Sequence, residues 1–293
     1  MSRARAWLHA ARIPTLAAAV VPVAVGSALA ARDHRFRPGP ALAALLGAIF
    51  IQIGTNLVND WGDFLRGADT RERLGPPRAL AMGWLTTSEV GAGIIASFLC
   101  ATLAGLYLVA TAGWIVVAIG LTSIAAGIAY TAGPWPLAYT GLGEIFVFVF
   151  FGMVAVCGTY FVEGNTLSPD VMLAAIPVGA LATAILVVNN VRDLDGDRAA
   201  GKRTLAVRVG RRGARAEYVA LLAVAYATPA LLALSGRASG WVILPFLTVP
   251  FAALEGRRVL AREDGASLNA ALKGTARLHV LFGILFATGM MIA

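Results

Sequence analysis

The stretch GLGEIFVFVFFGMVAVCGTYFV, residues 141–162, decides the fold class of this chain. It holds a single charged side chain, Glu144, near its start. An apolar run of about 20 residues is long enough, as a helix, to cross the roughly 30 Å hydrocarbon core of a membrane. The stretch therefore predicts a transmembrane helix.

The rest of the chain repeats this pattern. Of 293 residues, 58% are hydrophobic and 14% are charged, whereas about a quarter are charged in soluble domains. The further candidate spans are 13–31, 40–58, 89–110, 113–130, 170–190, 217–235, 240–255 and 275–293; of these, 240–255 is short and contains Pro245 and Pro250. The remaining residues are too few for a separate soluble domain. We expect an all-α membrane bundle of about nine transmembrane helices, forming one domain over residues 1–293.

The basic residues predict the orientation of the bundle. With the N-terminus in the cytoplasm, 20 of the 24 Lys and Arg fall in cytoplasmic segments, and Arg32, Arg35, Arg37 and Arg237 fall outside. This satisfies the positive-inside rule, so the net charge of +8 needs no nucleic-acid partner. A cleaved signal peptide ending near Ser27–Ala30 is an alternative for the N-terminus, but the first apolar run is long enough for an ordinary span. We expect a multi-pass protein of the cell membrane.

Two acidic motifs close the second and sixth spans. The first contains Asn56, Asp60 and Asp63, and the second contains Asn189, Asp193 and Asp197. Each begins Asn-x3-Asp, and on a helix each set shares one face. Because four spans separate the motifs, both open on the cytoplasmic side. The pattern suggests a four-helix unit used twice, with a ninth helix added.

Carboxylates clustered at a membrane boundary repel one another and are costly to desolvate. Oxygen ligands with one or two carboxylates per ion suit Mg²⁺ that bridges substrate phosphates. Basic residues follow each motif, including Arg78 after the first and Lys202 and Arg203 after the second. This arrangement favours a diphosphate held by metal ions and cations. The alternative is a set of solvated loop charges, which the repeated spacing makes the weaker interpretation.

Glu144 interrupts a long stretch that carries almost no charge. A carboxylate within a membrane span is a functional candidate by default, although it can also cap the start of a helix. Tyr130 and Tyr139 precede it and are either site residues or interfacial anchors.

At these residues the chain resembles the UbiA superfamily of intramembrane aromatic prenyltransferases, and within it the branch that acts on 1,4-dihydroxy-2-naphthoate. The resemblance covers residues 11 to about 215. It lies in residues 56–60, Asp63, Asp69, 73–76, 130–134, 141–144, 189–193, Asp197 and 201–208. The wider family's first motif is Asn-x3-Asp-x3-Asp, whose second acid falls where Phe64 stands, and the shift to Asp63 and Asp69 is typical of the naphthoate branch.

The resemblance, combined with the motifs, implies a specific reaction. Two Mg²⁺ ions are expected on Asp60, Asp63, Asp193 and Asp197, with Asn56 and Asn189 as ligands or orienters. Arg78, Lys202 and Arg203 are expected to bind the diphosphate of a polyprenyl donor, and further substrate contacts are expected from Asp69, Tyr130, Tyr139 and Glu144. The resemblance implies that the acceptor, 1,4-dihydroxy-2-naphthoate, loses CO₂ to give demethylmenaquinone.

Two other interpretations remain open. One is a prenyltransferase for a different aromatic acceptor. The other is a transporter or a Mg²⁺ channel, but transport sites usually lie near the bilayer midplane, whereas these acids lie at one membrane face.

Overall fold

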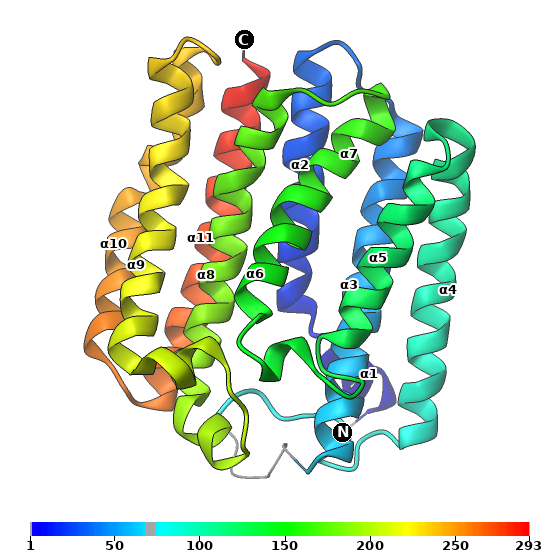
Figure 1. Ribbon diagram of the computed structural model, residues 1–293, viewed down its shortest axis with the longest axis vertical. Coiled ribbons are helices and arrows are strands. Elements are labelled where there is room, and N and C mark those ends of the chain that lie inside the picture. Colours follow the sequence, from blue (N-terminus) through cyan, green and yellow to red (C-terminus); the bar gives the residue numbers. More distant parts are fainter. Residues whose placement is uncertain (1, 68–73, 293) are drawn as a thin grey trace.

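The computed structural model describes residues 2–67 and 74–292, and this part of the chain contains helices and no strands (Figure 1). In chain order the elements are α1 Arg3–Ala11, η1 Ile13–Leu16, α2 Ala17–Arg32, α3 Pro38–Leu65, α4 Thr87–Ala112, α5 Ile115–Ala129, η2 Leu137–Tyr139, α6 Gly143–Val147, η3 Phe148–Val154, α7 Ala155–Gly164, α8 Pro169–Ala199, α9 Leu205–Leu234, η4 Gly240–Thr248, α10 Val249–Ala261 and α11 Gly265–Met291. Most of them run side by side along the long axis of the molecule.

The structure confirms the all-helical membrane bundle. Within the described residues, seven helical segments are long and apolar enough to cross a membrane: Arg3–Arg32, α3, α4, Gly143–Gly164, α8, α9 and α11. The shorter apolar helix α5 and the consecutive pair η4 and α10 complete a bundle of about nine spans. The least well-defined predicted span, 240–255, is a 3₁₀ segment that continues into α10.

Several helices extend past their predicted ends on the side of the acidic motifs. Helix α3 continues to Leu65 and α8 to Ala199, so both motifs are helical throughout. Helix α9 begins at Leu205, with a break at Gly210, whose φ is +74°. Much of the basic stretch expected as a loop after the sixth span is therefore helical. An apolar run in the sequence predicts only the part of a helix that crosses lipid. The helix can continue beyond that part as polar turns, which are buried by neighbouring helices.

Local sequence signals set several helix starts. The side chains of Ser168 and Thr204 accept hydrogen bonds from backbone amides in the first turns of α8 and α9. Thr86 and Glu89 form a capping box at the start of α4. Such caps satisfy amides that have no partner within the helix. They fix where α8 and α9 begin.

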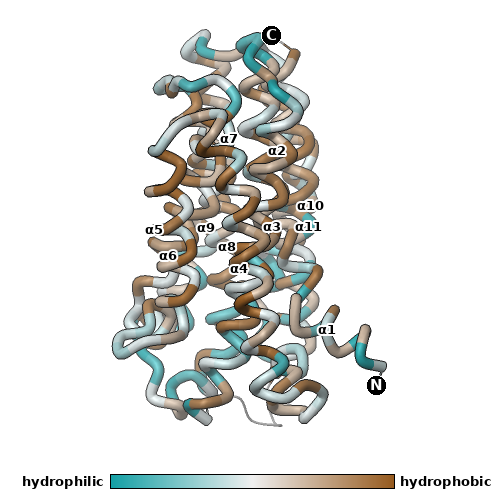
Figure 2. Tube along the Cα trace, turned by 90° about the vertical axis from the view of Figure 1, so that its right-hand side faces the viewer, coloured by the Kyte–Doolittle hydropathy of each residue, from teal (hydrophilic) through white to brown (hydrophobic). Residues whose placement is uncertain are grey.

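Helix α8 occupies the middle of the bundle, between α9 and α11 on one side and α6, η3 and α7 on the other. Figure 2 shows apolar residues around the middle of the bundle and polar residues towards its two ends. Where α8 crosses the π-helix η3, Gly152 faces Gly179, and a Cβ on Gly152 would lie 2.6 Å from the Gly179 Cα. The two backbones therefore touch with no side chain between them.

Candidate active site

A cavity of about 840 Å³ opens between the two acidic motifs. Its polar end is lined by Asp60 and Asp63 of α3 and by Asp193 and Asp197 of α8. Its other walls are mainly apolar and include Ala44 on α3, 16 residues before Asp60. At 1.5 Å per residue, that separation corresponds to about 24 Å along the helix. The cavity is thus a long apolar space with charged groups at one end.

The first motif lies on one face of α3 and is almost fully buried. Asp60 is 2% exposed and Asp63 is 3% exposed. The Asp60 carboxylate accepts a hydrogen bond from the Ala79 amide at 3.2 Å. The Asp63 carboxylate accepts one from the Tyr139 hydroxyl at 2.6 Å and pairs with Arg78 at 3.3 Å. The segment that contains Arg78 and Ala79 therefore closes against the end of α3.

The second motif is held by cations. The guanidinium of Arg192, whose side chain is 0% exposed, forms two hydrogen bonds to Asp193, at 2.8 and 2.6 Å. The Lys202 ammonium lies 3.5 Å from Asp197 and 3.6 Å from Asp63. Lys202 therefore connects the two motifs directly, although they are more than 130 residues apart in the sequence.

The two asparagines of the motifs form structural hydrogen bonds. The Asn56 amide nitrogen donates to the Ala11 carbonyl and to the Thr15 hydroxyl, both at 2.9 Å. The Asn189 carbonyl oxygen accepts from Arg192 at 2.8 Å. Asn56 thereby fixes the junction of α1 and η1 against α3, and Asn189 helps to orient the guanidinium that holds Asp193. These contacts favour an orienting role for both asparagines.

The loop before α6 brings the two predicted tyrosines to the cavity. Tyr139 lies beside Lys202, whose ammonium is 4.7 Å from the ring centroid, a cation–π distance. Tyr130 also lines the cavity. Its phenol can donate a hydrogen bond.

The structure places most of the predicted site residues on the cavity wall, which is lined by Asn56, Asp60, Asp63, Arg78, Tyr130, Tyr139, Asn189, Asp193, Asp197 and Lys202. The other three predicted residues differ. Arg203 is exposed and does not line the cavity, although its backbone amide donates to the Tyr139 carbonyl at 2.9 Å. Glu144 is buried but lies behind the wall, hydrogen-bonded to Asn190. Asp69 lies outside the described residues.

Sequence reasoning missed several polar residues of the site, among them Arg192 and Asn190. Arg192 links Asp193 to Asn189 and to Asn269 of α11. Its position beside Asp193 was a signal, because a buried carboxylate needs a buried cation. Asn190 lies on the cavity wall, and only its place within the second motif could have pointed to it.

The oxygen donors of the site suit Mg²⁺ ions whose coordination is completed by the substrate. Within the described residues, no three His, Cys, Asp or Glu side chains lie close enough together to hold a metal ion by themselves. Mg²⁺ commonly takes one or two carboxylates and completes its shell with water and substrate phosphates. The oxygen donors of each motif, with Arg78 and Lys202 beside them, match that chemistry.

The fold and the site together define an intramembrane protein whose apolar cavity has carboxylates and cationic side chains at one end. The chain belongs to the UbiA prenyltransferase family, whose model matches residues 19–290. It is 38% identical to the 1,4-dihydroxy-2-naphthoate octaprenyltransferase of Escherichia coli, over 100% of this chain and 97% of the relative. The enzymes of the same name from Mycobacterium tuberculosis and Bacillus subtilis are 36% and 35% identical, over 96% and 95% of this chain and 95% and 90% of their own.

Solved structures share the fold at lower identity. A UbiA homologue from Archaeoglobus fulgidus bound to GPP and Mg²⁺ superposes with a TM-score of 0.73 at 18% identity, covering 98% of this chain and 100% of that one. The same homologue bound to DMAPP and Mg²⁺ gives a TM-score of 0.70, also at 18% identity, covering 98% and 99%. At this identity the likeness establishes the fold.

Proposed function

We propose that this chain transfers a polyprenyl group from polyprenyl diphosphate to 1,4-dihydroxy-2-naphthoate, with loss of CO₂ and diphosphate, giving demethylmenaquinol, the reduced form of demethylmenaquinone. The main support is the meeting of two acidic motifs, linked through Lys202, at the end of a long apolar cavity. The names of the relatives aligned over the full chain support the naphthoate acceptor. The basic segments support a cell membrane location with the site facing the cytoplasm.

The site residues have separate roles in this proposal. Asp60, Asp63, Asp193 and Asp197 would hold two Mg²⁺ ions, which supply positive charge to the diphosphate of the donor. Lys202 and Arg78 add cationic groups at the same end of the cavity. Because negative charge builds on the diphosphate as its bond to the prenyl carbon breaks, fixed positive charge stabilises the transition state more than the bound substrate.

The apolar walls complete the mechanism. The cavity extends from the charged end along α3, so it can accept an isoprenoid tail while the diphosphate stays with the carboxylates. Exclusion of water protects an allylic cation until the electron-rich ring of the acceptor attacks it. The position of the acids at one end of the spans argues against transport, for which a site near the membrane midplane is usual.

The proposal is tested with purified protein in detergent, given Mg²⁺, a radiolabelled prenyl diphosphate and a panel of aromatic acids. We expect a prenylated naphthoquinol product, release of ¹⁴CO₂ from carboxyl-labelled 1,4-dihydroxy-2-naphthoate, and no turnover of 4-hydroxybenzoate. Asp60→Ala serves as the inactive control. Turnover of another acceptor in preference to the naphthoate would overturn the acceptor assignment, and diphosphate release without any prenylated product would overturn the reaction.

A further inference from the structure

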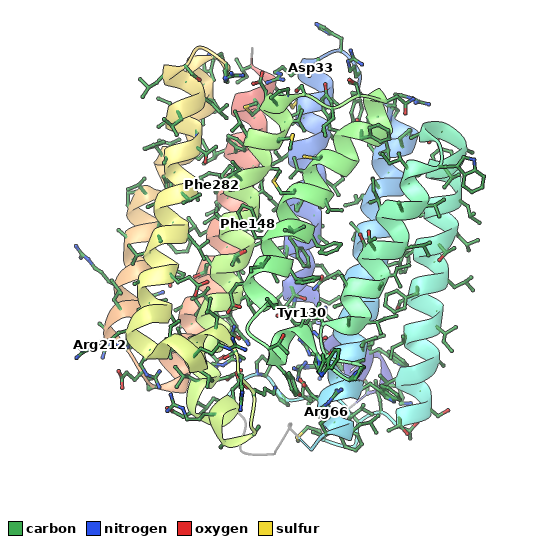
Figure 3. The ribbon with its side chains drawn as sticks, viewed as in Figure 1. Asp33, Arg66, Tyr130, Phe148, Arg212 and Phe282 are labelled. Atoms are coloured by element: carbon green, nitrogen blue, oxygen red, sulfur yellow. The ribbon has the colours of Figure 1, made fainter. Side chains whose placement is uncertain are left out.

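One corner of the cavity lies one helical turn from the carboxylates of the second motif. Three walls meet there: Gly143 at the start of α6, Tyr130 after α5 and Leu186 on α8. A Cβ on Gly143 would lie 3.2 Å from the Tyr130 hydroxyl and 3.5 Å from the Leu186 Cδ2. The lack of a side chain at Gly143 therefore lets the Tyr130 hydroxyl and Leu186 lie close to the backbone at the start of α6, where all three line the cavity. Figure 3 labels Tyr130 at the lower end of the bundle, on the same side as Arg66.

Asn190 supplies the polar group on the α8 side of this corner. It lines the cavity, four residues after Leu186 and three before Asp193. Residues three or four apart share one face of a helix, and three residues correspond to a rise of about 4.5 Å. The Asn190 side chain thus lies deeper in the cavity than Asp193, towards its apolar part.

Glu144 determines which atom Asn190 can offer. Glu144 is 5% exposed, lies behind the cavity wall and accepts a hydrogen bond from the Asn190 Nδ2 at 2.8 Å. It lies in the first turn of α6, where the helix dipole favours a negative charge. A carboxylate can only accept hydrogen bonds. The amide nitrogen of Asn190 must therefore face Glu144, which leaves the carbonyl Oδ1 for the cavity.

We propose that this corner, defined by Tyr130, Gly143, Leu186 and Asn190, holds the ring of the aromatic acceptor, and that one hydroxyl of the acceptor donates to the Asn190 Oδ1. Glu144 is a positioning residue that acts through Asn190 and does not touch the substrate. The inference rests on the proposed function and assigns a place to its acceptor. The cavity of about 840 Å³ that these residues line has room for an aromatic ring, and the Tyr130 hydroxyl can donate to an acceptor oxygen. An acceptor-only atom such as Oδ1 selects a substrate that carries a hydroxyl.

The experiment measures KM for each substrate separately in wild type, Glu144→Gln and Asn190→Leu. A Gln at position 144 can donate as well as accept, so it no longer fixes the Asn190 amide. We expect KM for the naphthoate to rise roughly 2- to 12-fold in both variants, the range for one hydrogen bond, with KM for the prenyl diphosphate unchanged. Glu163→Gln is the matched control. It replaces a buried carboxylate at the opposite end of the bundle, hydrogen-bonded to Ser27, and should leave both KM values unchanged.

A second measurement separates positioning from a general structural effect. Inhibition constants are compared for 1,4-dihydroxy-2-naphthoate analogues that lack one hydroxyl or the other. Wild type should bind one of the two monohydroxy acids several-fold more weakly than the dihydroxy acid, and this discrimination should disappear in Asn190→Leu and shrink in Glu144→Gln. Gly143→Ala, which narrows the corner without changing charge, should raise KM for the naphthoate alone.

Two outcomes would overturn the inference while leaving the proposed function intact. One is an equal rise in KM for both substrates in Glu144→Gln. The other is unchanged hydroxyl discrimination in Asn190→Leu. A wild-type protein that does not prenylate the naphthoate at all would instead refute the proposed function, and the inference with it.

Discussion

Three aspartates within five residues of α8 offer a test of the site in which the chemical change is the same each time. The helix is continuous from Pro169 to Ala199, through Gly196. At 100° per residue, Asp193 and Asp197 point in directions about 40° apart, and Asp195 points about 200° away from Asp193. The side chains agree with this geometry: those of Asp193 and Asp197 are each 14% exposed, whereas that of Asp195 is 74% exposed.

The contacts give the size of each effect. Asp195 pairs with Arg211 at 2.8 Å and with Arg198 at 3.8 Å, and exposed pairs contribute about 0–1 kcal/mol. We therefore expect Asp195→Asn to change kcat/KM by no more than about fivefold. Asp193→Asn leaves the buried Arg192 without its carboxylate, and removal of one partner of a buried pair lowers the free energy of unfolding by about 3–5 kcal/mol. Arg192 keeps Asn189 and Asn269, so we expect the lower end of that range.

Loss of one group that stabilises the charge developing in a transition state typically lowers kcat by about 10²–10³. We expect that loss for Asp193→Asn and a similar one for Asp197→Asn, which removes the carboxylate beside Lys202. The assay is steady-state prenyl transfer at one fixed Mg²⁺ concentration, with the thermal midpoint of each variant in detergent as the folding control. Equal losses of activity in all three well-folded variants would refute the helical geometry and add Asp195 to the site.

Three further outcomes are expected. Protein stripped with EDTA should be inactive and should recover when Mg²⁺ is added back; full activity without added divalent metal would contradict the assignment of the acidic motifs. Arg192→Lys should lower the free energy of unfolding by about 1–3 kcal/mol, because an ammonium cannot replace a bidentate guanidinium that also reaches two asparagines. Denaturation in mixed micelles measures this free energy, and an unchanged midpoint would count against the role given to Arg192. Gly120→Phe should reduce the use of long prenyl diphosphates more than that of short ones, because Gly120 lines the cavity and a Cβ there meets nothing within 4 Å. Product length by mass spectrometry tests this. Gly91→Phe is the control, since a Cβ at Gly91 also meets nothing within 4 Å but Gly91 does not line the cavity.

The sequence predicted those parts of the protein that depend on local patterns. Runs of apolar residues predicted the helices, and the Asn-x3-Asp spacing predicted that Asp60 and Asp63, and likewise Asp193 and Asp197, share a helix face. The even number of spans between the motifs predicted that both lie at one end of the bundle. The structure adds that Lys202 lies between them.

The parts that could not be predicted depend on tertiary contacts. Glu144 was identified as an unusual charge, but only the packing of α6 against α8 places it behind Asn190 instead of on the cavity wall. Arg203 follows Lys202 in the chain, yet the turn before α9 leaves one side chain exposed and directs the other to the carboxylates. Neither the spacing nor the residue type determines which of two adjacent cations faces a site.

The central position of α8 has a consequence for how the protein is made. Of the seven membrane-length helices, α8 has the highest hydropathy and is also the most enclosed by protein. A helix surrounded by protein does not need an apolar surface for lipid once the bundle is complete. However, its neighbours α9 and α11 are synthesised after it. During synthesis, the face of α8 that they later cover is therefore in contact with lipid. Its hydropathy therefore suits this temporary lipid contact. Helix α11, which follows the other six in the chain and packs against helices already made, has the lowest hydropathy of the seven.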